Sequence, residues 1–136
     1  MNRTLVIVKP DGVERGLAGE ILARLERKGL RLVAAELRRL DREIAERHYA
    51  EHAQRPYFEG LVAFITRSPV LVAVVEGPED TWRIVRAIMG VTNPADAAPG
   101  TIRGDLATQM SENLIHGSDS AESATREIGI FFPHLA

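Results

Sequence analysis

Two short apolar runs constrain the fold of this chain more than any other feature of its sequence. Residues 4–8 read TLVIV and residues 70–75 read VLVAVV, so both runs are rich in β-branched side chains. Each run stops at turn-forming residues, KPDG after the first and EGP after the second. The chain is therefore predicted to contain two strands that are buried in the interior.

A helix is predicted after each of these strands, because apolar residues recur there three and four positions apart. The first helix ends at Gly29 and the second at Gly90. An alternating run over residues 30–39 predicts another strand, and a short strand is expected near Leu114 and Ile115. The resulting order, strand–helix–strand–strand–helix–strand, is typical of an α/β protein of the α+β type. Its expected core is a ferredoxin-like antiparallel sheet with helices packed on one face.

Added helices and a long loop complete this plan. The added helices are expected over residues 41–53, 58–65 and 119–128. Asp41 is a candidate N-cap of the first, and Asp119 with Glu122 resembles a capping box at the start of the last. Residues 91–105, VTNPADAAPGTIRGD, show no usable period and predict a long loop before the last strand. Loops of this length in a small domain are usually functional.

Length and composition limit the classes to which the chain belongs. Residues 1–136 are expected to form a single domain. The formal net charge of −2 excludes a globally basic nucleic-acid binder but leaves room for a local anion pocket. No cysteine is present, which removes disulfides and thiolate metal sites. The first apolar run is too short for a signal peptide or a membrane span, so a cytoplasmic protein without a membrane partner is expected.

The segment NLIHGSDS places His116 where an apolar run meets a polar turn. A histidine at the end of a strand has no special role by itself, so a function for His116 depends on which side chains lie near it in the folded protein. Neither a P-loop nor a dinucleotide-binding glycine motif is present, so a nucleotide would have to bind in another way. Basic side chains gathered around His116 would form a phosphate clamp. The candidates for this clamp are Lys9, Arg55, Arg86 and Arg103.

The segment HYAEH supports a different hypothesis, a small zinc metallopeptidase. It matches the H-x-x-E-H pattern, and on a helix His48 and His52 would share one face, with Glu51 nearby. A helix rich in charged residues produces such short matches by chance, and a catalytic zinc also needs a third ligand and a cleft for the peptide. A solvated or partly buried helix face is the simpler explanation of this segment.

Several segments of the chain together resemble the nucleoside diphosphate kinase family. They are TLVIVKPDGVERGLAGEI, HYAEH, RPYFEGLV, TNPAD, PGTIRGD and NLIHGSDSAESATREI, and they follow one another over residues 4–132. NLIHGSDS and TNPAD…PGTIRGD are highly specific as a pair. The resemblance implies a transferase that passes the γ-phosphoryl group of a nucleoside triphosphate to a nucleoside diphosphate by a ping-pong mechanism, through a phosphohistidine. It also implies that HYAEH belongs to the nucleotide cleft.

The resemblance implies a role for ten residues. His116 matches the nucleophile, Glu127 the carboxylate that supports it, and Ser118 the hydroxyl beside it. Asn113 matches the contact to the sugar hydroxyl. Tyr57 stands where the family usually has a Phe stacked on the base, so the ring is kept and the added hydroxyl is free to point to water. The contacts to phosphate correspond to Lys9, Tyr49, Arg86, Thr92 and Arg103.

The resemblance also implies a cofactor and partners. The cofactor is Mg²⁺, held mainly through the nucleotide phosphates and not by protein ligands. The partners are nucleoside tri- and diphosphates and further copies of the chain, with a hexamer favoured over a tetramer; no nucleic acid is required. A nucleotide-sensing module without turnover is an alternative, but a complete set of site residues argues against it. That set comprises Lys9, Arg86, Arg103, Asn113 and His116.

Overall fold

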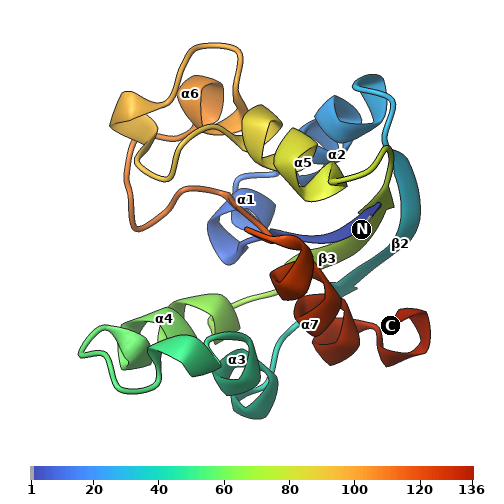
Figure 1. Cartoon of the computed structure of the whole chain (residues 1–136). Coiled ribbons are helices and arrows are strands. Elements are labelled where there is room, and N and C mark those ends of the chain that lie inside the picture. Colours follow the sequence, from blue (N-terminus) through green and yellow to red (C-terminus); the bar gives the residue numbers. More distant parts are fainter. Residues whose placement is uncertain (1) are drawn as a thin grey trace.

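The computed structural model describes residues 2–136 and contains a four-stranded antiparallel sheet (Figure 1). The strands lie in the order β2-β3-β1-β4, so the first strand of the chain is paired on both sides. This order confirms the predicted ferredoxin-like arrangement of the α+β type. The strands are β1 (Arg3–Val8), β2 (Arg31–Arg38), β3 (Val70–Glu76) and β4 (Ile115–Gly117).

Helices of different lengths surround the sheet and account for most of the remaining chain. The α-helices are α1 (Pro10–Glu14), α2 (Ala18–Arg27), α3 (Arg42–His48), α4 (Phe58–Thr66), α5 (Thr81–Met89), α6 (Ile102–Leu106) and α7 (Ala121–Phe131). The short 3-10 helices are η1 (Ala50–His52), η2 (Pro94–Asp96) and η3 (Pro133–Leu135). In Figure 1, α2, α5 and α6 lie on one side of the sheet, and α3, α4 and α7 lie on the other.

The sheet is therefore covered on both faces, whereas the sequence assigned only the helices of the ferredoxin-like core to a face. On the face of α2, α5 and α6, the core includes Val6 and Val8 of β1. On the face of α3, α4 and α7, it includes Leu5 and Ile7 of the same strand. Successive side chains of a strand point to opposite faces, so burial on both faces explains why the strand is continuously apolar. Helices α2 and α5 of the ferredoxin-like core lie on one face as predicted, and the added helices α3, α4 and α7, which the sequence did not assign to a face, cover the other.

Three local predictions need correction. The KPDG segment begins helix α1 and is not only a turn, since Pro10 suits the first position of a helix. The predicted loop over residues 91–105 contains η2 and the start of α6, whose N-cap is Thr101. The last helix is capped by the side chain of Ser120, which accepts a backbone N–H three residues further on. Asp119 is therefore not its cap.

The helix predicted over residues 41–53 is shorter than expected. Asp41 caps it as predicted, because its carboxylate accepts the Ile44 N–H at 2.9 Å. The helix ends at His48, since Tyr49 leaves the α-helical conformation with φ −98° and ψ 20°, and the chain continues as η1. His48 and His52 therefore do not share one face of a continuous helix.

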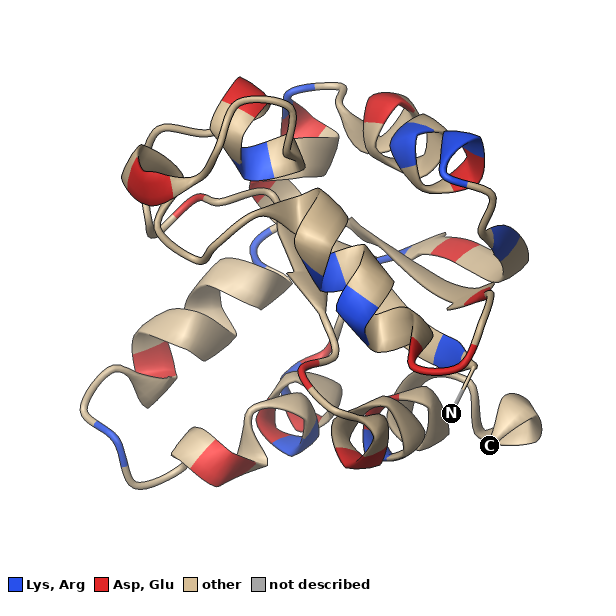
Figure 2. Ribbon diagram, turned by 45° about the horizontal axis from the view of Figure 1, so that its top comes forward, with Lys and Arg blue, Asp and Glu red and all other residues tan. Residues whose placement is uncertain are grey.

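Charged residues of both signs are distributed over the helices, and neither sign dominates the view in Figure 2. This distribution agrees with the exclusion of a globally basic nucleic-acid binder. Within residues 2–136, no helix combines the length and the apolar character needed to cross a membrane.

Candidate active site

Strand register directs the His116 side chain to the face of the sheet that α3, α4 and α7 cover. His116 pairs with Ile7 across β4 and β1, so both side chains project from the same face. Ile7 belongs to the core beneath these three helices. The neighbours Ile115 and Gly117 project from the opposite face. The imidazole is therefore presented to helices that a one-sided ferredoxin-like plan does not include.

A strained turn leads the chain into this position. Leu114 has φ +76°, a left-handed conformation that costs a non-glycine residue about 1–3 kcal/mol. Its N–H donates to Asp11 Oδ2 at 3.0 Å, and its carbonyl accepts the Lys9 N–H at 2.8 Å. Asp11 comes from α1, so this short helix holds the turn that precedes the histidine.

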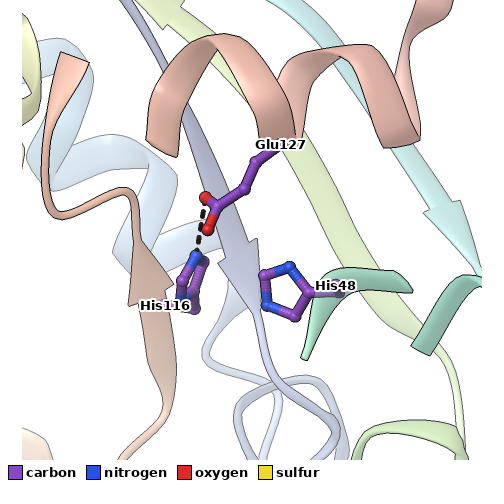
Figure 3. Close-up of side chains that lie close together, drawn as sticks. All are labelled: His48, His116 and Glu127. Atoms are coloured by element: carbon purple, nitrogen blue, oxygen red, sulfur yellow. Dashed lines mark hydrogen bonds and ion pairs between the residues drawn. The ribbon is translucent and has the colours of Figure 1, made fainter. Parts of the chain in front are cut away.

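His116, Glu127 and Ser118 form one hydrogen-bonded group, and Figure 3 shows its two principal members. His116 Nε2 lies 2.9 Å from Glu127 Oε1, and Ser118 Oγ donates to the same oxygen at 2.7 Å. An ionised carboxylate only accepts hydrogen bonds, so Nε2 carries the imidazole proton and donates it. Nδ1 then keeps a free lone pair, which is the state that a nucleophilic histidine needs.

Glu127 keeps its negative charge although its side chain is only 5% exposed. Burial by itself raises the pKa of this carboxyl. The hydrogen bond and charge of His116 together with the hydrogen bond from Ser118 outweigh burial and lower the pKa of Glu127 to about 2. A buried negative charge is thus present beside the imidazole at neutral pH.

Lys9 and Asn113 connect the end of β1 to the turn before β4. Lys9 Nζ donates to Asn113 Oδ1 at 2.9 Å, and Asn113 Nδ2 donates to the Thr92 carbonyl at 3.0 Å. Burial, with a smaller contribution from the Arg103 charge, lowers the pKa of Lys9 to about 8, while Asp11 opposes this shift. A cation in these surroundings gains stability when an anionic ligand binds beside it.

Arg103 holds the backbone around the candidate site. Its Nε donates to the Asn113 carbonyl at 3.1 Å, and one terminal nitrogen donates to the Gly90 carbonyl at 3.1 Å. The other terminal nitrogen donates to the Ile115 carbonyl at 2.6 Å. Burial and the nearby Arg86 charge lower the pKa of Arg103 to about 10. A guanidinium has five N–H donors, so two of them are not used by these three contacts to the backbone.

A pocket of about 180 Å³ opens beside His116. Arg86, which donates to the Gly117 carbonyl at 2.9 Å, lies on its wall together with Tyr49. Burial raises the pKa of Tyr49 to about 12, so its hydroxyl stays protonated and can donate a hydrogen bond. The remaining lining residues are His48, Glu51, His52, Gly117, Asp119 and Glu127.

Tyr57 lies further out and is 49% exposed. Its hydroxyl is 3.0 Å from His52 Nδ1, so the suggestion that this hydroxyl points to water is wrong. The two rings lie 5.5 Å apart. Because His52 lines the pocket beside His116, this hydrogen bond ties the exposed Tyr57 ring to the pocket wall.

Most of the predicted site residues thus lie around one end of β1 and β4, but sequence reasoning missed two residues that contact the site. The sequence indicates only a turn at Asp11 and gives no sign of its hydrogen bond to the Leu114 N–H. It indicates His48 only as half of a zinc pair, yet the ring packs edge-on against His116 with centroids 4.6 Å apart. Arg55, a candidate for the clamp, is exposed between η1 and α4 and is not among the residues that line the pocket.

Comparison with known proteins gives consistent matches over the whole chain. A family model described as nucleoside diphosphate kinase matches residues 2–136. A nucleoside diphosphate kinase of Thermomicrobium roseum is 61% identical over 132 residues, which cover 97% of this chain and 88% of that protein. One from Thermus thermophilus is 60% identical over 132 residues, covering 97% of this chain and 96% of that protein.

Solved structures match the fold with equal consistency. A halophilic nucleoside diphosphate kinase from Halobacterium salinarum, solved in complex with CDP, is 53% identical with a TM-score of 0.92. The match covers 97% of this chain and 88% of that one. A nucleoside diphosphate kinase family protein from Babesia bovis is 46% identical with a TM-score of 0.95, over 98% of this chain and 90% of that one.

Proposed function

Because this chain belongs to the nucleoside diphosphate kinase family, and is therefore a nucleoside-triphosphate:nucleoside-diphosphate phosphotransferase, we propose that His116 carries the phosphoryl group between the two nucleotides. Membership of this family favours phosphoryl transfer over both the zinc metallopeptidase and the sensing module without turnover. The observation that carries the assignment is the 2.9 Å hydrogen bond from His116 Nε2 to Glu127, which leaves Nδ1 free to attack.

In the first half-reaction, the Nδ1 lone pair forms a bond to the γ-phosphorus as the bond to the bridging oxygen breaks. The diphosphate leaves with that oxygen, and the imidazole becomes a phosphohistidine. The ring gains positive character as the bond forms, and the buried charge of Glu127 stabilises it through Nε2–H. In the second half-reaction, a terminal oxygen of a different diphosphate forms a bond to the same phosphorus as the Nδ1–P bond breaks, which returns the lone pair to Nδ1. Both halves use the same groups, so one pocket serves donor and acceptor in a ping-pong mechanism.

The side chains near His116 are suited to holding phosphates. Lys9, Arg86 and Arg103 supply positive charge, and Arg103 keeps two donors beyond those that hold the backbone. Tyr49 offers a protonated hydroxyl on the pocket wall. Thr92 is assigned to the phosphates by resemblance to the family, and its exposed position leaves its hydroxyl accessible.

The sugar and the base are assigned to residues at the periphery of the site. Asn113 accepts a hydrogen bond from Lys9, so a sugar hydroxyl bound by the Asn113 amide would lie next to a residue of the phosphate clamp. Tyr57 presents a half-exposed ring on which a base can stack by its face, and stacking reads no base edge. The Halobacterium salinarum relative was solved with CDP, a pyrimidine diphosphate, which supports a nucleoside diphosphate as the ligand of this chain.

Mg²⁺ is proposed as the ion that enters with the nucleotide, bound mainly to its phosphate oxygens. The pocket fits such an ion, because the acidic residues Glu51 and Asp119 line it, and Mg²⁺ prefers oxygen ligands and keeps several waters. The ion supplies neutralisation of the phosphate charge. Omission of Mg²⁺ from the assay should abolish transfer, and full activity with nucleotide and a chelator would contradict this assignment.

The chain is proposed to act as a single-domain cytoplasmic enzyme that assembles with copies of itself, a hexamer before a tetramer. Support comes from the edge strand β2, where Leu37 is 61% exposed, and from Met110, which is 60% exposed beyond α6. Apolar side chains on an unpaired sheet edge favour burial against another subunit. Light scattering that gives a monomer mass at micromolar concentration would refute the assembly.

The nucleophile is tested by replacing His116 with Ala and incubating the protein with ATP labelled in the γ-position. The parent should form an acid-labile, base-stable phosphoprotein, whereas His116→Ala should bind nucleotide and remain unlabelled. His134→Ala, which changes an exposed histidine near the C-terminus, is the matched control and should be labelled like the parent. A His116→Ala protein that still becomes labelled and turns over at the parent's rate would end the proposal.

A further inference from the structure

Three potential metal ligands converge beside the nucleophile. Within residues 2–136, His48, His116 and Glu127 form a group whose candidate ligand atoms all lie within 4.8 Å of one another. Figure 3 shows the two imidazole rings side by side, with the Glu127 carboxylate above the His116 ring. The three side chains come from α3, β4 and α7, so only the folded chain brings them together.

His48 is the member of this group that has no assigned task. It is 3% exposed, and its Nδ1 has no hydrogen-bond partner. A buried polar atom without a partner costs a protein about 1–3 kcal/mol, and an apolar side chain of similar size would avoid this cost. Ring contacts at 4.6 Å to His116 and 5.5 Å to Phe131 hold the imidazole in place. A polar ring retained in this position is explained if it binds a ligand.

The sequence motif HYAEH suggested a different pair, His48 with His52. Helix α3 ends at His48, and His52 lies in η1 with its Nδ1 bonded to the Tyr57 hydroxyl. His48 therefore finds its partners in His116 and Glu127, which are distant in sequence. The motif therefore indicated one candidate ligand, His48, but paired it with His52 instead of His116 and Glu127.

We propose that His48, His116 and Glu127 form a site for Zn²⁺ in the nucleotide-free, unphosphorylated protein, and that the bound ion blocks the enzyme. Two imidazoles and one carboxylate are a ligand set that zinc accepts with water in the fourth position. Zinc binds such ligands at about 2.0–2.2 Å. The candidate ligand atoms, which lie within 4.8 Å of one another, must therefore move closer together when the ion binds.

Binding at this site would inactivate His116 by changing its tautomer. A neutral imidazole carries one proton, which sits on Nε2 while that nitrogen donates to Glu127. A metal bound at Nε2 needs the lone pair of that nitrogen, so the proton leaves Nε2 and a proton is taken up at Nδ1. Nδ1 then has no lone pair with which to attack phosphorus. The blocking effect rests on the proposed role of His116, whereas the metal site rests only on the three side chains.

Zinc binding is measured by equilibrium dialysis of nucleotide-free protein in a buffer that does not chelate metals. The parent should bind one Zn²⁺ per chain, and His48→Gln should bind it at least about tenfold more weakly. His52→Gln removes the other histidine of HYAEH and should bind zinc like the parent. Equal binding by His48→Gln and the parent, or loss of binding in His52→Gln, would overturn the proposal.

Two measurements on the parent remain decisive even where His48→Gln does not fold. Imidazole nitrogen NMR should show zinc-induced shifts for His48 and His116 and none for His52 and His134; the reverse pattern would overturn the site. Parent loaded with one equivalent of zinc should be labelled by excess Mg²⁺–ATP at least about tenfold more slowly than metal-free parent, and a chelator should restore the rate. Unchanged labelling overturns the block. Metal-free parent that is not labelled contradicts the nucleophile instead, and the dialysis result still decides the metal site.

Discussion

Replacement of Glu127 by Gln tests how much the buried carboxylate contributes to phosphoryl transfer. The substitution keeps the length and nearly the volume of the side chain and removes its charge. In the parent, the carboxylate is 5% exposed and accepts from His116 Nε2 at 2.9 Å and from Ser118 Oγ at 2.7 Å. The Gln oxygen can still accept, so the two proteins differ mainly in charge.

The size of the effect follows from the difference between charged and neutral hydrogen bonds. A hydrogen bond to a charged group contributes about 1.5–3 kcal/mol and a neutral one about 0.5–1.5 kcal/mol, so the change removes about 1–1.5 kcal/mol. Because the imidazole gains positive character as the N–P bond forms, this loss falls on the transition state, and transfer should slow by roughly tenfold. If the Gln amide turns its NH₂ towards His116, it favours the tautomer protonated on Nδ1, and the loss becomes larger.

Rapid mixing with γ-labelled ATP, followed by quenching in base, measures the first half-reaction directly. Glu127→Gln should show a lower maximum rate of phosphohistidine formation and a nearly unchanged nucleotide dissociation constant. Glu122→Gln removes an exposed carboxylate from the first turn of the same helix and serves as the control. A maximum rate within about twofold of the parent, or a loss confined to nucleotide binding, would refute the argument, which rests on the hydrogen bond between the carboxylate and His116.

Three further outcomes are expected. Tyr57→Ala should weaken the binding of ADP and GDP alike by about 1–3 kcal/mol in fluorescence titrations, while Tyr57→Phe keeps the stacking ring and should stay near the parent; a hundredfold preference for one base would contradict stacking alone. Arg103→Ala should slow transfer and lower the free energy of unfolding in urea by about 2 kcal/mol, since the loss of its hydrogen bonds to backbone carbonyls outweighs the regained hydration. Unchanged stability would mean that Arg103 serves only as a phosphate contact. Because the pKa of Glu127 is lower in the folded protein than in the unfolded chain, its ionised carboxylate stabilises the fold at a pH above the unfolded value. The difference in stability between the parent and Glu127→Gln should therefore decline as the pH falls from about 5 to 2 in thermal unfolding. A constant difference would contradict the shift.

The strands and most helices were predictable because their signals are local. Unbroken apolar runs marked β1 and β3, and helical periodicity marked α2 and α5. Periodicity shows that a helix has an apolar face but does not show which layer that face packs against. The sequence therefore did not reveal that α3, α4 and α7 cover the second face of the sheet. Helix α1 was missed because it covers only Pro10–Glu14, too few residues for a period to appear.

The members of the site were predictable from motifs, whereas their contacts were not. Family resemblance identified His116 and Glu127 as partners, and the structure joins them by a hydrogen bond. The contact between His48 and His116 spans distant segments and depends on where α3 ends, which a few residues around Tyr49 decide. The three hydrogen bonds of Arg103 to backbone carbonyls were also beyond sequence reasoning, because a carbonyl leaves no mark in the sequence.

The segment NLIHGSDS places a histidine at the border of the core because each of its neighbours has a separate structural task. Leu114 adopts a left-handed conformation, and α1 and the end of β1 hold its N–H and its carbonyl. Gly117 packs closely on α5, since an added Cβ would lie 2.6 Å from Met89 Sδ and 3.3 Å from Val85 Cγ1. This close packing fixes β4 against α5, and alternation then turns His116 to the opposite face, towards Glu127. The second layer of helices, absent from the one-sided plan, is thus what orients a strand-end histidine for the nucleophilic role proposed for it.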